Sequence, residues 1–138
     1  MKKKLGVILG VALVAVMLVA VLAGCVPSDP AKAESNLKSE GYTAVKAEGI
    51  AAQIAASVFT AIADVDLDKV DAVVTGVKGT DRISMIYFKD SSSANDYFNK
   101  FEPAVKKMAE ETNADDYAFG KSGSVVYFGT TAAVKAAK

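Results

Sequence analysis

The sequence predicts an α+β domain in which helices pack on a single, mostly antiparallel sheet. Two pairs of strand-like segments predict the sheet. Runs rich in β-branched and aromatic residues occupy positions 70–89 and 117–128, and a glycine-containing turn divides each pair. Apolar residues that recur at intervals of three and four predict helices between and beside these pairs. Hairpins combined with separate helices are typical of the α+β class.

The first expected elements are a helix, a strand and a second helix. Pro30 suits the first turn of a helix over residues 31–40, and Gly41 predicts its end. A strand is expected over residues 42–47. Residues 49–63 predict a strongly amphipathic helix, and we expect its apolar stripe to pack in the core: Ile50, Ile54, Ala55, Val58, Phe59 and Ile62.

A hairpin and a long helix are expected next. Residues 70–78 and 82–89 predict two strands joined by a turn at Gly79. Both faces of the second strand are apolar, which predicts a central strand covered on both sides. The following helix is expected over residues 91–112, with serine N-caps and a kink or break at Pro103. Its buried stripe is expected to be Tyr97, Phe98, Phe101, Val105 and Met108.

A second hairpin and a final helix complete the expected fold. Residues 117–119 and 124–128 predict strands around a turn at 120–123, and residues 130–138 predict a helix. The order of elements contains a β-α-β-β-α-β core, similar to the ferredoxin-like split arrangement, with extra N- and C-terminal helices. No long Pro, Gly or Ser tract divides residues 30–138, so we expect one domain there.

The first part of the chain has the layout of a signal segment. Lys2, Lys3 and Lys4 precede residues 5–24, which contain no charged side chain. Twenty apolar residues are also enough to span a bilayer as a helix, at about 1.5 Å per residue. The segment is therefore either a signal peptide or the anchor of an uncleaved single-pass membrane protein.

The end of the apolar segment, Leu22-Ala23-Gly24-Cys25, resembles the lipobox of bacterial lipoproteins. The resemblance implies that a signal peptidase recognises Leu22, Ala23 and Gly24. It also implies that Cys25 receives diacylglycerol and becomes the new N-terminus. Residues 1–24 would then be a lipoprotein signal peptide and residues 25–29 a short tether. The domain is expected outside the cytoplasm, anchored by lipid to the bacterial cell membrane.

Composition excludes several classes of site. The chain has no histidine and a single cysteine, so it holds neither an internal disulfide, nor a Cys/His zinc site, nor imidazole catalysis. From Cys25 onward there are 13 basic and 16 acidic residues, a net charge of −3. An acidic domain without a basic stripe predicts no nucleic-acid binding. We also expect no metal and no other cofactor.

Three local motifs fall short of a site. The carboxylates from Asp64 to Asp71 resemble the start of a calcium loop, but Lys69 and Thr75 stand where glycine and glutamate are needed. Gly120-Lys121-Ser122 lacks the earlier glycine and the following helix of a phosphate-binding loop. Serine-lysine spacings and adjacent carboxylates occur at several positions without further elements of a catalytic motif.

We therefore expect a non-enzymatic binding or scaffolding module of the cell envelope. Its partners would be membrane lipid, through acylated Cys25, and an envelope protein, peptide or glycan. A small envelope hydrolase that uses Ser/Lys or paired carboxylates is the alternative. One sheet face is a candidate partner surface if it is open, and core if the terminal helices cover it: Met85, Tyr87, Val125 and Tyr127.

Overall fold

The computed structural model describes residues 26–112 and 116–138. Nine regular elements and two short 3₁₀ helices follow one another in this part of the chain. Their bounds are α2 (Pro30–Ser39), β1 (Thr43–Glu48), α3 (Ile50–Ala56), η1 (Ser57–Ala61), η2 (Leu67–Lys69), β2 (Val70–Lys78), β3 (Asp81–Phe88), α4 (Ser91–Thr112), β4 (Ala118–Ser122), β5 (Val125–Gly129) and α5 (Thr131–Ala137).

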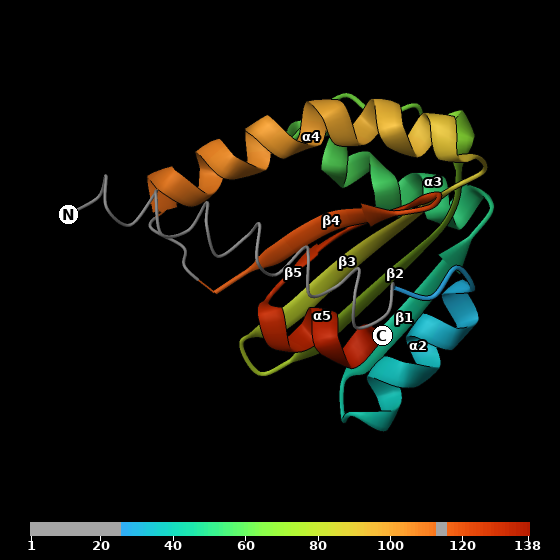
Figure 1. Cartoon of the computed structure of the whole chain (residues 1–138). Coiled ribbons are helices and arrows are strands. Elements are labelled where there is room, and N and C mark those ends of the chain that lie inside the picture. The colour runs from blue at the N-terminus through green and yellow to red at the C-terminus, as the bar shows by residue number, and fades with distance from the viewer. Residues whose placement is uncertain (1–25, 113–115) are drawn as a thin grey trace.

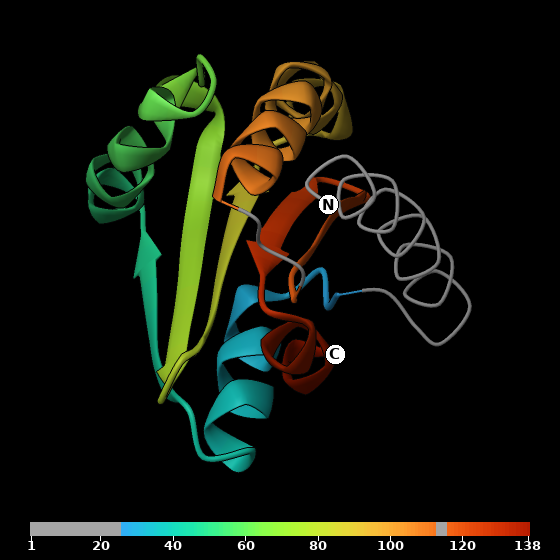
Figure 2. The same cartoon turned by 90° about the vertical axis from the view of Figure 1, so that its left-hand side faces the viewer.

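The α+β prediction is confirmed. The five strands form one sheet in the order β1-β2-β3-β5-β4, and every neighbouring pair is antiparallel. Figures 1 and 2 show α3 and α4 on one face of this sheet and α2 and α5 on the other. We call these the α3/α4 face and the α2/α5 face. Among the described residues, the molecule is thus a three-layer arrangement with a hydrophobic core on each side of the sheet.

The ferredoxin-like part of the prediction holds for only one of its two β-α-β units. Strands β3 and β4 run in the same direction and β5 lies between them, so β3-α4-β4 is a split unit. Strands β1 and β2 are instead direct antiparallel neighbours. The connecting helices differ as well: α4 is one helix of 22 residues, about 33 Å long, whereas α3 has seven residues and continues as η1.

Strand β3 is central and buried on both faces, as its sequence predicts. Ile83, Met85 and Tyr87 belong to the core of the α2/α5 face, and Ile86 and Phe88 belong to that of the α3/α4 face. The core of the α3/α4 face is rich in aromatic rings, many of which come from α4, β4 and β5. The Phe101 ring has its centre 5.4–6.0 Å from those of Tyr97, Phe119 and Phe128. Such pairs stabilise by about 0.5–1.5 kcal/mol beyond their buried area.

The helix expected over residues 49–63 differs from the prediction. The α-helix ends at Ala56 and continues as the 3₁₀ helix η1. Its buried side chains are Ala52 and Ala56, while Ala55, Phe59 and Ile62 are half-buried. The prediction that the other stripe residues pack in the core is wrong, because their side chains are 76%, 68% and 65% exposed: Ile50, Ile54 and Val58. Alanine faces the sheet because its short side chain lets the helix backbone approach β2 closely.

Helix α4 is confirmed with three differences. It runs from Ser91 to Thr112 without a break at Pro103. Asp90, rather than a serine, caps its start, and one carboxylate oxygen accepts a hydrogen bond from the Ser93 amide at 2.7 Å. Near the other end Met108 is 43% exposed and Ala109 is buried in its place. The side chains of Tyr97, Phe101 and Val105 are buried as expected.

Candidate functional site

The first described residues are packed against the sheet. Val26 is 3% exposed and belongs to the core of the α2/α5 face. The hydroxyl of Tyr87 on β3 donates a hydrogen bond to the carbonyl oxygen of Pro27, with 2.8 Å between the oxygens. We call this pair of features the chain-start contact. It fixes the backbone one and two residues after Cys25.

The environment of Tyr87 keeps its hydroxyl protonated. Burial raises the pKa of this phenol, and the negative charge of Asp29 raises it further. A phenol with a raised pKa remains a hydrogen-bond donor throughout the neutral range. The Tyr87 hydroxyl can therefore donate to the Pro27 carbonyl oxygen throughout that range.

Helix α2 holds the same segment from the other side. Asp29 caps the helix, because one of its carboxylate oxygens accepts a hydrogen bond from the Ala31 amide at 2.9 Å. The side-chain amide of Asn36 donates to the carbonyl oxygen of Ala137 in α5 at 3.0 Å. This bond joins the helices that lie near the two ends of the described chain. Within the range assigned to a tether, Val26 is thus packed and Pro27 is bonded.

The lipobox-like motif comes before the first described residue. Leu22, Ala23, Gly24 and Cys25 lie outside the described residues. Within 26–112 and 116–138, no helix combines the length and the apolar character needed to cross a bilayer.

The candidate partner face is buried. Met85, Tyr87, Val125 and Tyr127 are between 0% and 4% exposed. They share a core with side chains of the two helices on this face: Ala33, Leu37, Ala133, Val134 and Ala137. The structure therefore gives the covered alternative, in which this face is core and offers no open platform.

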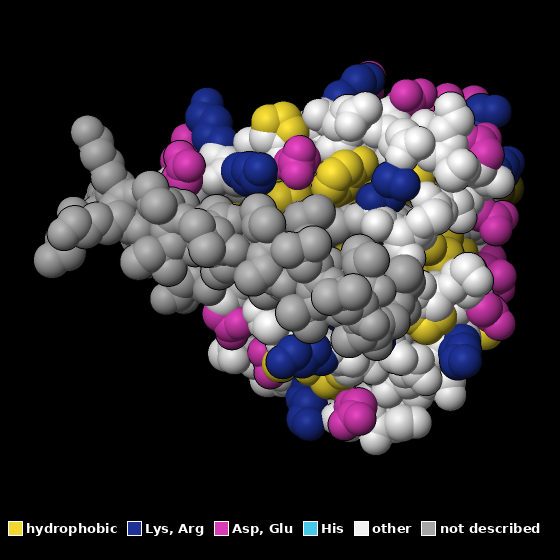
Figure 3. All heavy atoms as spheres, in the orientation of Figure 1, with side chains coloured by type: hydrophobic (Ala, Val, Ile, Leu, Met, Phe, Trp, Pro, Cys, Tyr) yellow, Lys and Arg dark blue, Asp and Glu magenta, His cyan; other side chains and the backbone are white. Residues whose placement is uncertain are grey.

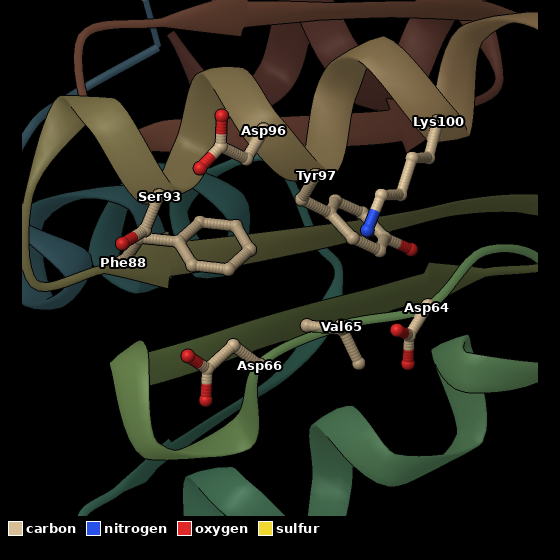
Figure 4. A pocket seen from close by; sticks show the side chains of 8 residues that line it. All are labelled: Asp64, Val65, Asp66, Phe88, Ser93, Asp96, Tyr97 and Lys100. Atoms are coloured by element: carbon tan, nitrogen blue, oxygen red, sulfur yellow. The ribbon is translucent and has the colours of Figure 1, made fainter.

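A pocket of about 500 Å³ opens between α4 and the loop that joins η1 to η2. Figure 4 shows side chains of α4 on one side and those of the loop on the other, with Phe88 at one end. Burial raises the pKa of Tyr97, whose hydroxyl donates to the Phe59 carbonyl oxygen at 3.4 Å. The lining residues are Asp64, Val65, Asp66, Phe88, Ser93, Asp96, Tyr97 and Lys100.

The polar groups of this pocket do not converge on one point. Figure 4 shows Ser93 and Lys100 at opposite ends, with Tyr97 between them. The amide and hydroxyl of Ser93 bond to Asp90, and these bonds lower the pKa of the Asp90 carboxyl. Ser93 therefore serves the Asp90 cap of α4, and the lysine of the pocket lining, Lys100, lies at the opposite end from it (Figure 4).

The carboxylates of the pocket are exposed, and one of them caps a short helix. Asp66 caps η2, because its carboxylate accepts a hydrogen bond from the Asp68 amide at 3.2 Å. Figure 3 shows acidic side chains along the right-hand edge of the molecule, the end at which α4 begins. In the described part of the chain, no three His, Cys, Asp or Glu residues are grouped so that they could hold a metal ion.

A second, shallower hollow of about 370 Å³ lies at the tip of the β2-β3 hairpin. Lys78 closes one side of it. Its ammonium group donates to the Glu40 carbonyl oxygen at 2.8 Å and lies 5.7 Å from the centre of the Tyr42 ring. These contacts tie the hairpin to the end of α2, so we interpret this hollow as a structural junction.

Sequence reasoning selected Tyr87 for its place on a sheet face and missed the bond of its hydroxyl. The partner lies 60 positions away, on a carbonyl group that every residue possesses. No side-chain pattern in the sequence could have indicated it.

The fold and the chain-start contact define a small α+β domain, built on one antiparallel sheet, whose first described residues are part of its core. The chain matches no protein-family model, and no curated protein or solved structure is significantly similar to it.

Proposed function

We propose that this protein is a bacterial lipoprotein whose domain is a non-enzymatic binding or scaffolding module of the cell envelope. The observation that carries the proposal is the Leu22-Ala23-Gly24-Cys25 motif at the end of an apolar segment. Its partners are membrane lipid, through acyl chains on Cys25, and an envelope protein, peptide or glycan. The domain lies outside the cytoplasm, at the membrane surface.

The chain-start contact sets the geometry of the attachment in this proposal. A lipid on Cys25 is one residue away from the buried Val26 and two residues from the bonded Pro27. Two residues span about 7 Å when extended. The domain would therefore sit directly on the lipid head groups, with the α2/α5 face on the side of the anchor.

Lipid chains must supply the attachment. Each buried CH₂ group contributes about 0.8 kcal/mol, and one chain alone binds only marginally, whereas a lipoprotein cysteine carries at least two. The net charge of −3 from Cys25 onward gives no attraction to anionic lipids. Loss of the acyl groups should release the domain.

The larger pocket bears on the hydrolase alternative. Its acidic residues and Lys100 are exposed to solvent, and its serine is bonded to Asp90. Acid-base catalysis by a carboxyl pair requires environments that separate their pKa values, usually by burial of one. Exposed carboxylates on opposite walls of an open pocket do not meet that requirement.

Cell fractionation of two full-length chains tests the attachment. We expect the wild-type protein to fractionate with membranes and to incorporate an alkyne-labelled fatty acid. The Cys25→Ser chain should incorporate none and should keep its signal segment. Equal labelling of both chains would contradict the proposal. Membrane retention of an unlabelled, uncleaved wild-type chain would instead establish the single-pass alternative.

A further inference from the structure

An apolar stripe runs along the outer side of α3 and η1. Ile50 and Ile54 lie about one turn apart on α3, and Val58 follows four residues later in η1. They are 76%, 68% and 65% exposed. The buried Ala52 and Ala56 lie on the opposite side of the same helix. We call these three exposed side chains the outer stripe.

A helix that is apolar on two opposite sides is typical of an element buried on both. In α3 only one side is covered by the domain. Water contact at three large aliphatic side chains costs about 1.5–3 kcal/mol each relative to full burial. The outer stripe therefore has the character of a contact surface.

The polar groups beside the outer stripe favour its burial. The Ser57 hydroxyl donates to the Ile54 carbonyl oxygen at 2.6 Å, and the Thr60 hydroxyl donates to the Ser57 carbonyl oxygen at 2.7 Å. Both hydroxyls thus already have an acceptor within their own helix. A partner that covers them leaves no donor unsatisfied, so the desolvation cost is small.

The bilayer is a poor fit to the outer stripe. Val26, next to the proposed acylated residue, lies in the core of the α2/α5 face, while Ala52 and Ala56 lie in that of the α3/α4 face. Figure 2 shows α3, coloured teal to green, across the sheet from α2 and α5. This step rests on the proposed function: with the lipid on Cys25, the chain-start contact places the anchor on the α2/α5 side, and the outer stripe then points away from the membrane.

The charge pattern fits a second copy of the same chain. Residues 49–63 contain no charged side chain. A two-fold axis places a surface against itself, which is unfavourable for a patch with net charge and harmless for a neutral one. Homodimer interfaces are also more apolar than other protein surfaces and have few charges at their centre.

We infer that the outer stripe is the centre of a homodimer contact. Two copies of the α3-η1 segment pack across a two-fold axis, with Ile50, Ile54 and Val58 of each copy against those of the other. A stable dimer buries about 800 Å² per copy, so residues around the stripe contribute as well.

The mass of the full-length protein in solution is the first test. We expect light scattering of the detergent-solubilised chain, corrected for bound detergent, to give the mass of two chains. The Ile54→Glu chain should dissociate at least tenfold more readily, as expected on loss of a central apolar contact. Met108→Glu is the matched control, since Met108 is also an exposed apolar residue on a helix, and it should leave the dimer intact.

Cysteine cross-linking in membranes gives a second, independent readout. An Ile54→Cys chain should form a disulfide-linked dimer under mild oxidation, and a Met108→Cys chain should form at least tenfold less. Circular dichroism of each variant verifies that the fold is retained. A wild-type protein that is monomeric at all concentrations, or an equally dimeric Ile54→Glu chain, would overturn the inference. Flotation of a monomeric chain with phosphatidylcholine vesicles that depends on Ile54 would overturn it too, in favour of a lipid contact.

Discussion

The hydroxyl of Tyr87 and the carbonyl oxygen of Pro27 are 2.8 Å apart and join the start of the described chain to the central strand of the sheet. The bond links segments that are 60 residues apart, and it lies beside the buried side chain of Val26. If Cys25 is acylated, this contact holds the residue that carries the lipid close to the sheet.

Tyr87→Phe removes the hydroxyl and leaves the ring. The part-buried Pro27 carbonyl then lacks its donor, so we expect the free energy of unfolding to fall by about 1–2 kcal/mol. Urea denaturation measures this change. Hydrogen exchange should also show faster exchange of the amides of Val26, Ser28 and Asp29. Tyr42→Phe, which retains the ring beside Lys78, is the control, and equal effects of the two substitutions would contradict the role of Tyr87.

Tyr117→Phe should have the opposite effect. The Tyr117 hydroxyl is buried and lacks a hydrogen-bond partner among the described residues. Burial raises the pKa of this phenol to about 12. Removal of an unsatisfied buried hydroxyl should raise the free energy of unfolding by about 0.5–1 kcal/mol, while the stacked contact with Phe119 remains. Thermal or urea denaturation that shows a loss of stability would mean that the hydroxyl has an essential partner.

The stability contributed by the α4 cap should depend on pH. Hydrogen bonds from the Ser93 amide and hydroxyl lower the pKa of the Asp90 carboxyl. A pKa lower in the folded than in the unfolded state stabilises the fold above the unfolded value, and this stabilisation is lost as the pH falls through the folded value. Asp90→Asn should therefore destabilise the protein at pH 7 and make little difference near pH 2. A difference between the two proteins that stays constant from pH 7 to pH 2 would contradict the assignment.

Gly129→Ala should destabilise the junction of β5 and α5. A Cβ atom at this position would meet the Arg82 carbonyl oxygen and would lie 2.7 Å from the Ile83 Cα atom. Both are backbone atoms of β3, so the strands must separate, at a cost of about 1–3 kcal/mol. Ser122→Ala on β4 serves as the control and should change the free energy of unfolding by less than about 0.5 kcal/mol. Equal stability of the two variants would contradict the close approach.

Much of the sheet could be predicted from the sequence because alternation records burial directly. The apolar residues on both faces of β3 predict a central strand, and the structure places β3 in the middle of the five. Strand direction was harder. The order of elements suggested two β-α-β units, but β1 and β2 are direct antiparallel neighbours. The order of elements does not determine which strands become neighbours, so the first unit differs from the prediction.

Burial in α3 could not be predicted because two sets of apolar residues share helical spacing. One set has large side chains: Ile50, Ile54 and Val58. The domain instead buries the small side chains of Ala52 and Ala56. Hydrophobicity favours burial of the larger side chains, but close approach of the helix to β2 favours burial of the smaller ones. The chain-start contact was unpredictable for a different reason, because its acceptor is a backbone carbonyl.

Intact-mass spectrometry of the protein purified from a bacterial host tests the central claim most directly. We predict a chain that begins at Cys25 and carries the mass of a diacylglyceryl group, with or without a further acyl chain. Tandem spectra should place the added mass on Cys25. A chain that retains Met1 and has an unmodified thiol at Cys25 would contradict the account.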